Sequence, residues 1–407
     1  MAGRRRGSWV VALCSALCSA LCLALLAGCG ADPVPDTAAG DVRRLLDRRA
    51  HAVLSGDERA YERTERPAHG RSGAPDLFAN VRAIPLETWE YRLSRLDRSG
   101  SRATARAELR YRVEGYDRAP LTAERTLSLE RHDGQWYVTA ERPAKKAGEQ
   151  LWDQGRVRAE RGADSLVLGV GRGARELRAH RALADRAVPA VRDAWPGKWP
   201  GKVVVLVPRS LKGMAGLLGA PASGYRGIAA VTTGEAGGTG RAPADRIIVN
   251  PEAYGVLGDF GKQVVLTHET THVATRTRTS PATPLWLSEG FADWVGYRGT
   301  GRTAAQAAPE LGRAVRGGEL PRELPGDDEF GFGTDAGRLA RAYEGAWLAC
   351  RMIADRWGER RLTDFYRAVG GHGKRAGAVE DALRDVLRTT PEEFTARWRT
   401  YLRSELG

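Results

Sequence analysis

The sequence predicts an α+β protein built from two parts, and three observations support this prediction. Between Trp89 and Val138, apolar residues recur at every second position, which is the period of half-buried β-strands. Beyond Asn250 they recur at intervals of three and four, which is the period of helices that bury one face. At 407 residues, the chain is long enough for about two domains.

The first part is expected over residues 41–143. Residues 41–61 predict an amphipathic helix whose apolar side carries Val42, Leu45, Leu46, Val53 and Leu54. The alternating stretches that follow predict strands, and Asp133-Gly134 between two of them predicts a tight hairpin turn. A helix followed by a curved antiparallel sheet is similar to the nuclear-transport-factor-two-like cone. That fold hosts many functions, so the resemblance implies no particular chemistry.

A charged stretch, residues 144–162, is expected to link this part to a second domain over residues 163–407. That domain is expected to begin with a small mixed sheet and to continue as a mainly helical half. Its first strand, Leu166–Leu168, runs into the segment Gly169-Val170-Gly171-Arg172-Gly173-Ala174, which matches a dinucleotide-binding pattern. The next strand, however, ends in Pro208-Arg209, where the ribose-binding acid of such a site belongs. The glycines are therefore interpreted as a strand-to-helix turn, and no bound nucleotide is expected.

Two short motifs in the helical half indicate the chemistry. Residues 268–272 read His-Glu-Thr-Thr-His, and side chains four apart lie on one face of a helix, so His268 and His272 can bind one Zn²⁺. Glu269 lies beside the open metal position, where it can take a proton from water that the metal has made acidic. A second apolar helix carries Glu289 as a third ligand. A five-residue pattern also arises by chance, but a buried carboxylate needs compensation, which a metal provides.

Together the two motifs resemble the gluzincin metallopeptidases, and most of all their aminopeptidase-like branch. The resemblance consists of HExxH, sixteen further residues, and then a glutamate within Trp-Leu-x-Glu-Gly-x-Ala. It implies one zinc ion per chain, bound by His268, His272 and Glu289, with Glu269 as general base and acid. It also implies hydrolysis of peptide bonds in a peptide or protein substrate.

The same resemblance implies supporting roles for Asp293 and Tyr343. Asp293 would accept a hydrogen bond from the ring N–H of a ligand histidine that does not face the metal, and so fix the orientation of that ring. The alternative interpretation of Asp293 is a solvent-exposed charge on the helix. Tyr343 would donate a hydrogen bond to the oxyanion. The alternative for Tyr343 is simple core packing, because it begins an apolar stripe of Ala346, Trp347, Cys350, Ile353 and Trp357. One residue separates Tyr343 from Gly345, where the aminopeptidases usually have two.

The resemblance does not extend to aminopeptidase specificity. Those enzymes carry a Gly-Ala-Met-Glu-Asn strand whose glutamate holds the free amine of the substrate. The strand-like runs that precede the zinc helix, residues 228–233 and 246–250, contain no acid in that setting. The sequence therefore predicts peptide-bond hydrolysis and leaves the endo or exo mode open.

The first residues are interpreted as a signal for export and anchoring. Arg4-Arg5-Arg6 precedes an apolar run that ends in Leu26-Ala27-Gly28-Cys29. Small residues before a cysteine at this place are typical of a lipoprotein signal, here residues 1–28, with Cys29 lipidated and residues 29–40 as a tether. A plain membrane anchor is the alternative, but the run is short for a membrane span. We therefore expect a protein held at the cell membrane by lipid, on the extracytoplasmic face.

Charge and cysteine usage narrow the classes further. The net charge is +13, or +10 after subtraction of the three leader arginines, and the basic residues are scattered among acids without a nucleic-acid-binding motif. No nucleic-acid partner is expected. Loss of the leader and lipidation of Cys29 leave Cys350 alone in the folded part, which excludes an intrachain disulfide.

The sequence as a whole predicts a lipid-anchored, extracytoplasmic zinc metallopeptidase with an accessory α+β front domain. The alternative is a non-catalytic binding lipoprotein, in which zinc only stabilises the fold and the front domain captures a cell-envelope ligand. No residue of the expected catalytic set is missing, which favours the enzyme.

Overall fold

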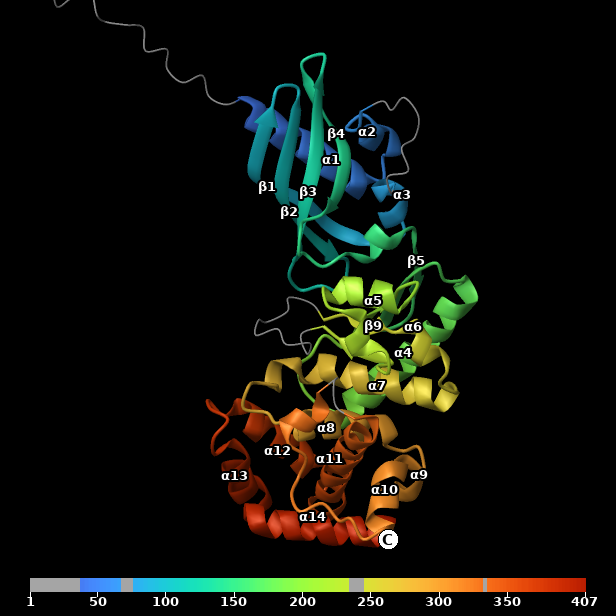
Figure 1. Ribbon diagram of the computed structural model, residues 1–407, viewed down its shortest axis with the longest axis vertical. Helices are drawn as coiled ribbons and strands as arrows, with labels where there is room; N and C mark the ends of the chain where they lie inside the picture. Colours follow the sequence, from blue (N-terminus) through green and yellow to red (C-terminus); the bar gives the residue numbers. More distant parts are fainter. Residues whose placement is uncertain (1–36, 67–75, 234–244, 332–334) are drawn as a thin grey trace, which may run out of the picture.

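The computed structural model describes residues 37–66, 76–233, 245–331 and 335–407. It confirms the predicted α+β class. A four-stranded sheet, a five-stranded sheet and a mainly helical half follow one another along the long axis of the molecule (Figure 1). Cys29 and the rest of the predicted leader lie outside the described residues.

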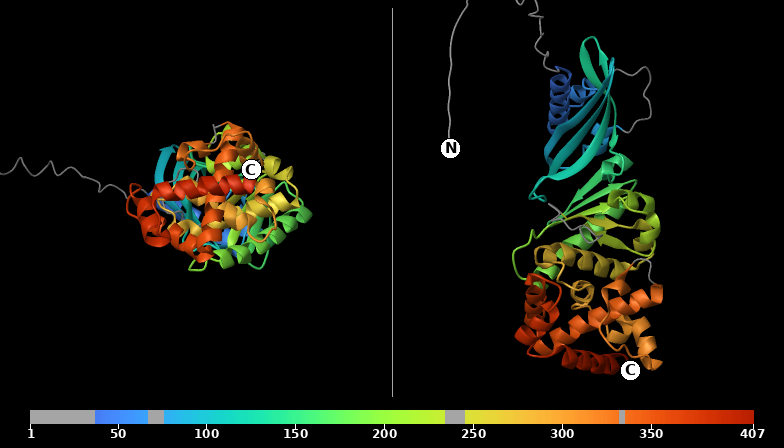
Figure 2. Two further views of the ribbon diagram at one scale, coloured as in Figure 1. Left: turned by 90° about the horizontal axis from the view of Figure 1, so that it is seen from below. Right: turned by 60° about the vertical axis from the view of Figure 1, so that its left-hand side comes forward.

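The front unit is an antiparallel sheet with helices packed beside it (Figures 1 and 2). The strands pair in the order β1-β2-β3-β4 and span Leu86–Ser99, Arg102–Val113, Leu121–His132 and Gln135–Pro143. The helices are α1 (Thr37–Ser55), α2 (Glu58–Glu62) and α3 (Leu77–Val81). The prediction of one helix over residues 41–61 is wrong. Gly56 adopts a φ of 68° and Asp57 caps α2, so the chain turns between α1 and α2.

The hairpin predicted at Asp133-Gly134 is confirmed. The turn joins β3 to β4, and its two residues have φ values of 48° and 79°, the left-handed pair that a type I′ turn requires. The predicted period of two is also confirmed along β2. The residues of β2 that face the core are Ala103, Ala105, Ala107, Leu109, Tyr111 and Val113.

The second sheet is mixed and has the strand order β5-β6-β7-β9-β8. In that order the strands span Val157–Arg161, Ser165–Val170, Val203–Val207, Ile247–Val249 and Ala230–Thr232. The middle strands are parallel, whereas β5 and β8 are antiparallel edge strands. Strand β5 lies within residues 144–162, which the sequence predicts as a linker. Its residues pair with β6, and buried Leu151 and Trp152 just before it join the front core.

The second sheet is the central layer of the molecule, because both of its faces are covered. Val203, Val205 and Val207 belong to a core shared with the helical half, whereas Val204 and Leu206 belong to a core shared with the front unit. A strand buried on both faces carries a continuous apolar run, as β7 does. The front unit is therefore joined to the rest of the protein by continuous apolar packing.

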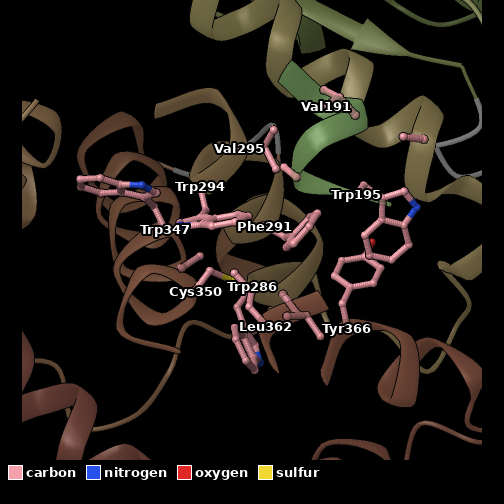
Figure 3. Packing of buried hydrophobic residues seen from close by; sticks show 14 of the residues in the cluster. Val191, Trp195, Trp286, Phe291, Trp294, Val295, Trp347, Cys350, Leu362 and Tyr366 are labelled. Carbon is pink, nitrogen blue, oxygen red and sulfur yellow. The ribbon is translucent and has the colours of Figure 1, made fainter. Parts of the chain in front are cut away.

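Helices cover the face of the second sheet that is turned away from the front unit. Helices α4 (Ala174–Ala194) and α7 (Asp259–Thr275) pack on the sheet and on each other. Phe291 lies at the centre of the core beneath them, in contact with the rings of Trp195, Trp294 and Tyr366 (Figure 3).

The remaining α-helices belong to the second sheet and to the helical half. They are α5 (Leu211–Leu218), α6 (Pro251–Gly255), α8 (Leu285–Tyr297), α9 (Ala304–Ala307), α10 (Pro309–Arg316), α11 (Ala336–Trp357), α12 (Glu359–Gly371), α13 (Ala378–Ala382) and α14 (Pro391–Leu406). Within the described ranges, no helix has both the length and the apolar character needed to span a membrane.

Candidate active site

Helix α7 carries the first motif. Leu266, Val273 and Ala274 anchor the helix in the core, so the polar side chains between them are held against neighbouring elements. The spacing of four places the rings of His268 and His272 side by side, with their centroids 4.7 Å apart and their Nε2 atoms 2.9 Å apart. The predicted pair of histidine ligands is therefore assembled on one face.

Helix α8 carries the second motif, and two glycines let it approach its neighbours. A Cβ atom on Gly290 would lie 2.3 Å from the carbonyl oxygen of Ala346 on α11, and one on Gly296 would lie 3.2 Å from the carbonyl oxygen of Val264 on α7. Only glycine permits the first of these approaches without a shift of the backbone. The close packing brings Glu289, which precedes Gly290, against the two histidines of α7.

Three ligand atoms converge at this point. Oε2 of Glu289 lies 3.3 Å from Nε2 of His268 and 3.6 Å from Nε2 of His272. Bonds of about 2.0–2.1 Å to a tetrahedral zinc ion place the ligand atoms about 3.3 Å from one another. Among the residues that the structure describes, these three form the cluster able to hold a metal ion. Both the donor types and their spacing therefore fit zinc.

The electrostatics of the cluster also favour a cation. Burial opposes protonation of His268, but the charge of Asp293 and hydrogen bonds to Asp293 and Glu289 outweigh it and raise the pKa of His268 to about 10. Burial opposes ionisation of Glu289, yet the positive charge of His272 and hydrogen bonds to both histidines hold the pKa of Glu289 well below its usual range. The surroundings thus stabilise positive charge at the point where the three ligands meet.

The structure places both predicted supporting residues at the cluster. Oδ1 of Asp293 lies 2.8 Å from Nδ1 of His268, the ring nitrogen that faces away from Glu289 and His272. A carboxylate in this position fixes the tautomer and the orientation of a ligand histidine. The ring of Tyr343, on α11, lies 6.5 Å from the ring of His268 and packs edge-on against Phe330 at 5.2 Å. The apolar stripe that follows Tyr343 on α11 is buried as predicted as far as Ile353.

Glu269 is buried on α7 next to His268, with 6% of its surface exposed. Its Oε2 atom lies 2.7 Å from the hydroxyl of Thr232, on edge strand β8. Sequence reasoning did not single out Thr232. A strand of three residues is too short to show a periodic pattern in the sequence. The contact between Thr232 and Glu269 joins residues that are far apart in the chain, so no short segment could predict it.

Comparison with known proteins adds a remote likeness only. No protein-family model and no curated protein matches the chain. Among solved structures, a two-domain M1 zinc metallopeptidase bound to L-arginine is 14% identical over 69% of this chain and 60% of that one, with a TM-score of 0.35.

Two further solved structures are similar to the same degree. An M1 zinc metallopeptidase from Deinococcus radiodurans is 14% identical over 75% of this chain and 62% of that one, with a TM-score of 0.34. Yeast LTA4 hydrolase is 12% identical over 68% of this chain and 44% of that one, with a TM-score of 0.37. The chain therefore spans less than two thirds of the length of each of the three.

Proposed function

We propose that the protein is a zinc-dependent peptidase. The observation that carries this proposal is the convergence of His268, His272 and Glu289, whose ligand atoms lie 2.9 to 3.6 Å apart, with Glu269 buried beside them. Two neutral imidazoles and one carboxylate form the three-ligand set typical of catalytic zinc, which keeps a further position open. One zinc ion per chain fits this cluster.

A zinc ion held by these residues supplies a Lewis acid that makes water acidic and polarises a carbonyl group. Glu269 is the residue that moves the proton. Its carboxylate accepts a proton from the attacking water and returns it to the nitrogen of the leaving amine. Asp293 holds the ring of His268 in the orientation that ligation needs. The hydroxyl of Tyr343 donates a hydrogen bond to the carbonyl oxygen as that oxygen becomes negative.

Peptides are the substrate class that the two sequence motifs support. The pattern HExxH followed by Glu in an apolar helix resembles the gluzincins, which cleave peptide bonds. Within the described residues, the two strands that precede α7 in the chain, Ala230–Thr232 and Ile247–Val249, carry no acid that could hold a substrate amine. The proposal is therefore peptide-bond hydrolysis, without an assignment to aminopeptidases.

The proposed location is the extracytoplasmic face of the cell membrane, through lipid on Cys29. This part of the proposal rests on the sequence of the leader, whose small residues precede Cys29 at the end of an apolar run. Replacement of Cys29 by serine should abolish incorporation of labelled lipid and release the protein from the membrane fraction. Persistence of lipid labelling in the variant would contradict this assignment.

The test of the proposed activity compares the wild type with Glu269→Gln. Both proteins should contain one zinc ion, measured by metal analysis, and only the wild type should cleave a mixed peptide library. Glu252→Gln is a matched control, because Glu252 bonds a backbone N–H at the start of α5 and lies in another element. Equal zinc contents with no cleavage by the wild type would support the non-catalytic alternative and overturn the peptidase.

A further inference from the structure

The carboxylate of Glu269 is held from outside the helix that carries it. The hydroxyl of Thr232 lies 2.7 Å from Oε2 of Glu269 and 3.1 Å from the backbone carbonyl oxygen of the same residue. A hydroxyl has one proton to donate, and an ionised carboxylate is the stronger acceptor. Thr232 is fully buried, so this contact does not compete with bulk water.

Strand β8, which carries Thr232, is short and lies at the edge of the second sheet. Its pairing with β9 comprises Ala230 with Val249, Val231 with Ile248 and Thr232 with Ile247. Three residues of an edge strand give little stability by themselves. The position of Thr232 therefore depends on what fixes the end of β8.

Several hydrogen bonds fix that end. The N–H of Thr233 donates to the carbonyl oxygen of Arg246 at 2.8 Å, and the N–H of Arg246 donates to the hydroxyl of Thr233 at 2.8 Å. Arg276, just after α7, donates to the carbonyl oxygen of Thr233 at 2.6 Å and to the carboxylate of Asp245 at 2.9 Å. The end of β8 is thus tied both to the start of β9 and to the end of the helix that carries Glu269.

The side chain of Arg246 extends this connection to the front unit. Its guanidinium donates two hydrogen bonds, of 2.8 and 2.7 Å, to the two carboxylate oxygens of Asp117. Asp117 follows β2 and also accepts the N–H of Val113 at 2.8 Å. Both side chains are buried, and a bidentate pair of this kind fixes the relative orientation of its partners.

We propose that Thr232 is a positioning residue for Glu269 and that Asp117 of the front unit, through Arg246, holds the strand that carries Thr232. The proposal rests on the proposed function, since it assigns the residues that orient the general base. It makes the front unit a part of the catalytic apparatus. The competing interpretation is that the pair of Asp117 and Arg246 only joins the two units and has no effect on Glu269. The following experiments distinguish these interpretations.

The first experiment removes the hydroxyl of Thr232. Thr232→Val keeps the shape of the side chain and loses the donor, whereas Thr232→Ser keeps the donor. We expect kcat to fall about ten- to hundredfold in the Val variant, with KM within about twofold and one zinc ion retained, and we expect the Ser variant to restore most of the rate. Wild-type kcat in the Val variant, or an equal loss in the Ser variant, would overturn the role.

Thr363→Val is the matched control for this substitution. The hydroxyl of Thr363 is also buried, but it donates to the carbonyl oxygen of Arg360 within α12. Its loss should leave kcat unchanged. A fall in kcat equal to that of Thr232→Val would mean that removal of any buried threonine hydroxyl disturbs the enzyme, and the assignment to Thr232 would fail.

The second experiment removes the charge of Asp117 and asks whether the effect passes through Thr232. Asp117→Asn should lower kcat in the wild-type background and cause no further loss in the Thr232→Val background. Additive losses in the double variant would show that Asp117 acts by another route. If Asp117→Asn alone does not fold, the pair Asp117→Asn with Arg246→Gln leaves no unpaired buried charge and is tested in the same way.

Asp153→Asn is the matched control for Asp117. Asp153 also forms a bidentate pair with a buried arginine, Arg125, at 2.9 and 2.8 Å, but it lies in the turn Leu151–Gln154 after β4, and its hydrogen bonds among the described residues join it to Arg125 and to the N–H of Gln150. Asp153→Asn should lower the unfolding temperature and leave kcat unchanged. Equal effects of Asp117→Asn and Asp153→Asn on kcat would indicate loss of stability only, and would contradict the proposal.

Two further measurements do not depend on activity. In hydrogen exchange, residues 230–233 should exchange faster in Asp117→Asn than in Asp153→Asn, and equal rates would contradict the role of Asp117. In a crystal structure of Thr232→Val, the carboxylate of Glu269 should leave its present position, and an unchanged position would contradict the role of Thr232. If the wild type cleaves no peptide, the proposed function is refuted. The two measurements would still show whether Asp117 stabilises β8 and whether Thr232 positions Glu269.

Discussion

Gly290 links the packing of the helical half to the metal site, and its replacement by alanine makes a sharp prediction. A Cβ atom at this position would lie 2.3 Å from the carbonyl oxygen and 2.5 Å from the carbonyl carbon of Ala346. Both are backbone atoms, so no side-chain rotation can relieve the contact. Helices α8 and α11 must move apart, and overpacking of this kind costs about 1–3 kcal/mol.

Replacement of Gly261, on α7, by alanine should change the free energy of unfolding in the opposite direction. A Cβ atom at Gly261 would lie 3.5 Å from the side chain of Leu257, which is an ordinary van der Waals distance. Alanine therefore causes no clash there, and its higher helix propensity should stabilise the protein by about 1 kcal/mol. We expect Gly290→Ala to lower the free energy of unfolding, measured by urea denaturation, and Gly261→Ala to raise it.

Gly290→Ala should also weaken zinc binding, because the displaced helix carries Glu289. A competition titration with a chelator measures this loss, and Gly261→Ala is again the control. If Gly290→Ala is as stable as the wild type and binds zinc equally well, the close approach of α8 and α11 does not position the third ligand, and the reasoning is refuted.

Three further predictions follow from individual side chains. Asp293→Asn should weaken zinc binding about ten- to hundredfold, because the hydrogen bond to Nδ1 of His268 loses its charge, and an unchanged affinity in a chelator competition would contradict this role. Burial lowers the pKa of His180, so its contribution to stability is present above the ordinary value of 6.5 and is lost as the pH falls below it. The free energy of unfolding should therefore fall between pH 7.5 and 5.5 by up to about 1.4 kcal/mol per pH unit more than in His180→Phe, and parallel profiles would refute this. Burial raises the pKa of the Cys350 thiol, so mass spectrometry should find Cys350 alkylated only after denaturation, whereas alkylation of the native protein would show that the site is open.

Much of the fold could be predicted because it depends on local periodicity. The strands around Trp89 and Ala105, the turn at Asp133-Gly134 and the helices that carry His268 and Glu289 each follow from a pattern within a few residues. The spacing of four between His268 and His272 is itself a geometric statement about a helix. The placement of His268 and His272 on one helix face therefore needed no knowledge of tertiary structure, whereas the ligand roles of His268, His272 and Glu289 and the roles of Glu269, Asp293 and Tyr343 stay predictions.

The rest depends on contacts that no short segment contains. The sequence of β5 is charged and lacks an apolar alternation. The segment forms a strand because its backbone pairs with β6. Asp117 and Arg246 are separated by 129 positions. In the sequence, nothing near either residue distinguishes it from an ordinary charged residue of a loop. The front unit was predicted as a separate accessory domain, but apolar residues on alternate positions of β7 give it a core in common with the second sheet. Period and composition cannot reveal which elements share a core.

Anomalous diffraction tests the central claim most directly. Crystals of the protein exposed to zinc should be measured just above and just below the zinc absorption edge. The account predicts one strong anomalous peak per chain, about 2.0–2.2 Å from Nε2 of His268, Nε2 of His272 and a carboxylate oxygen of Glu289. Absence of a peak at these three atoms, with the side chains in contact only with one another, would contradict it.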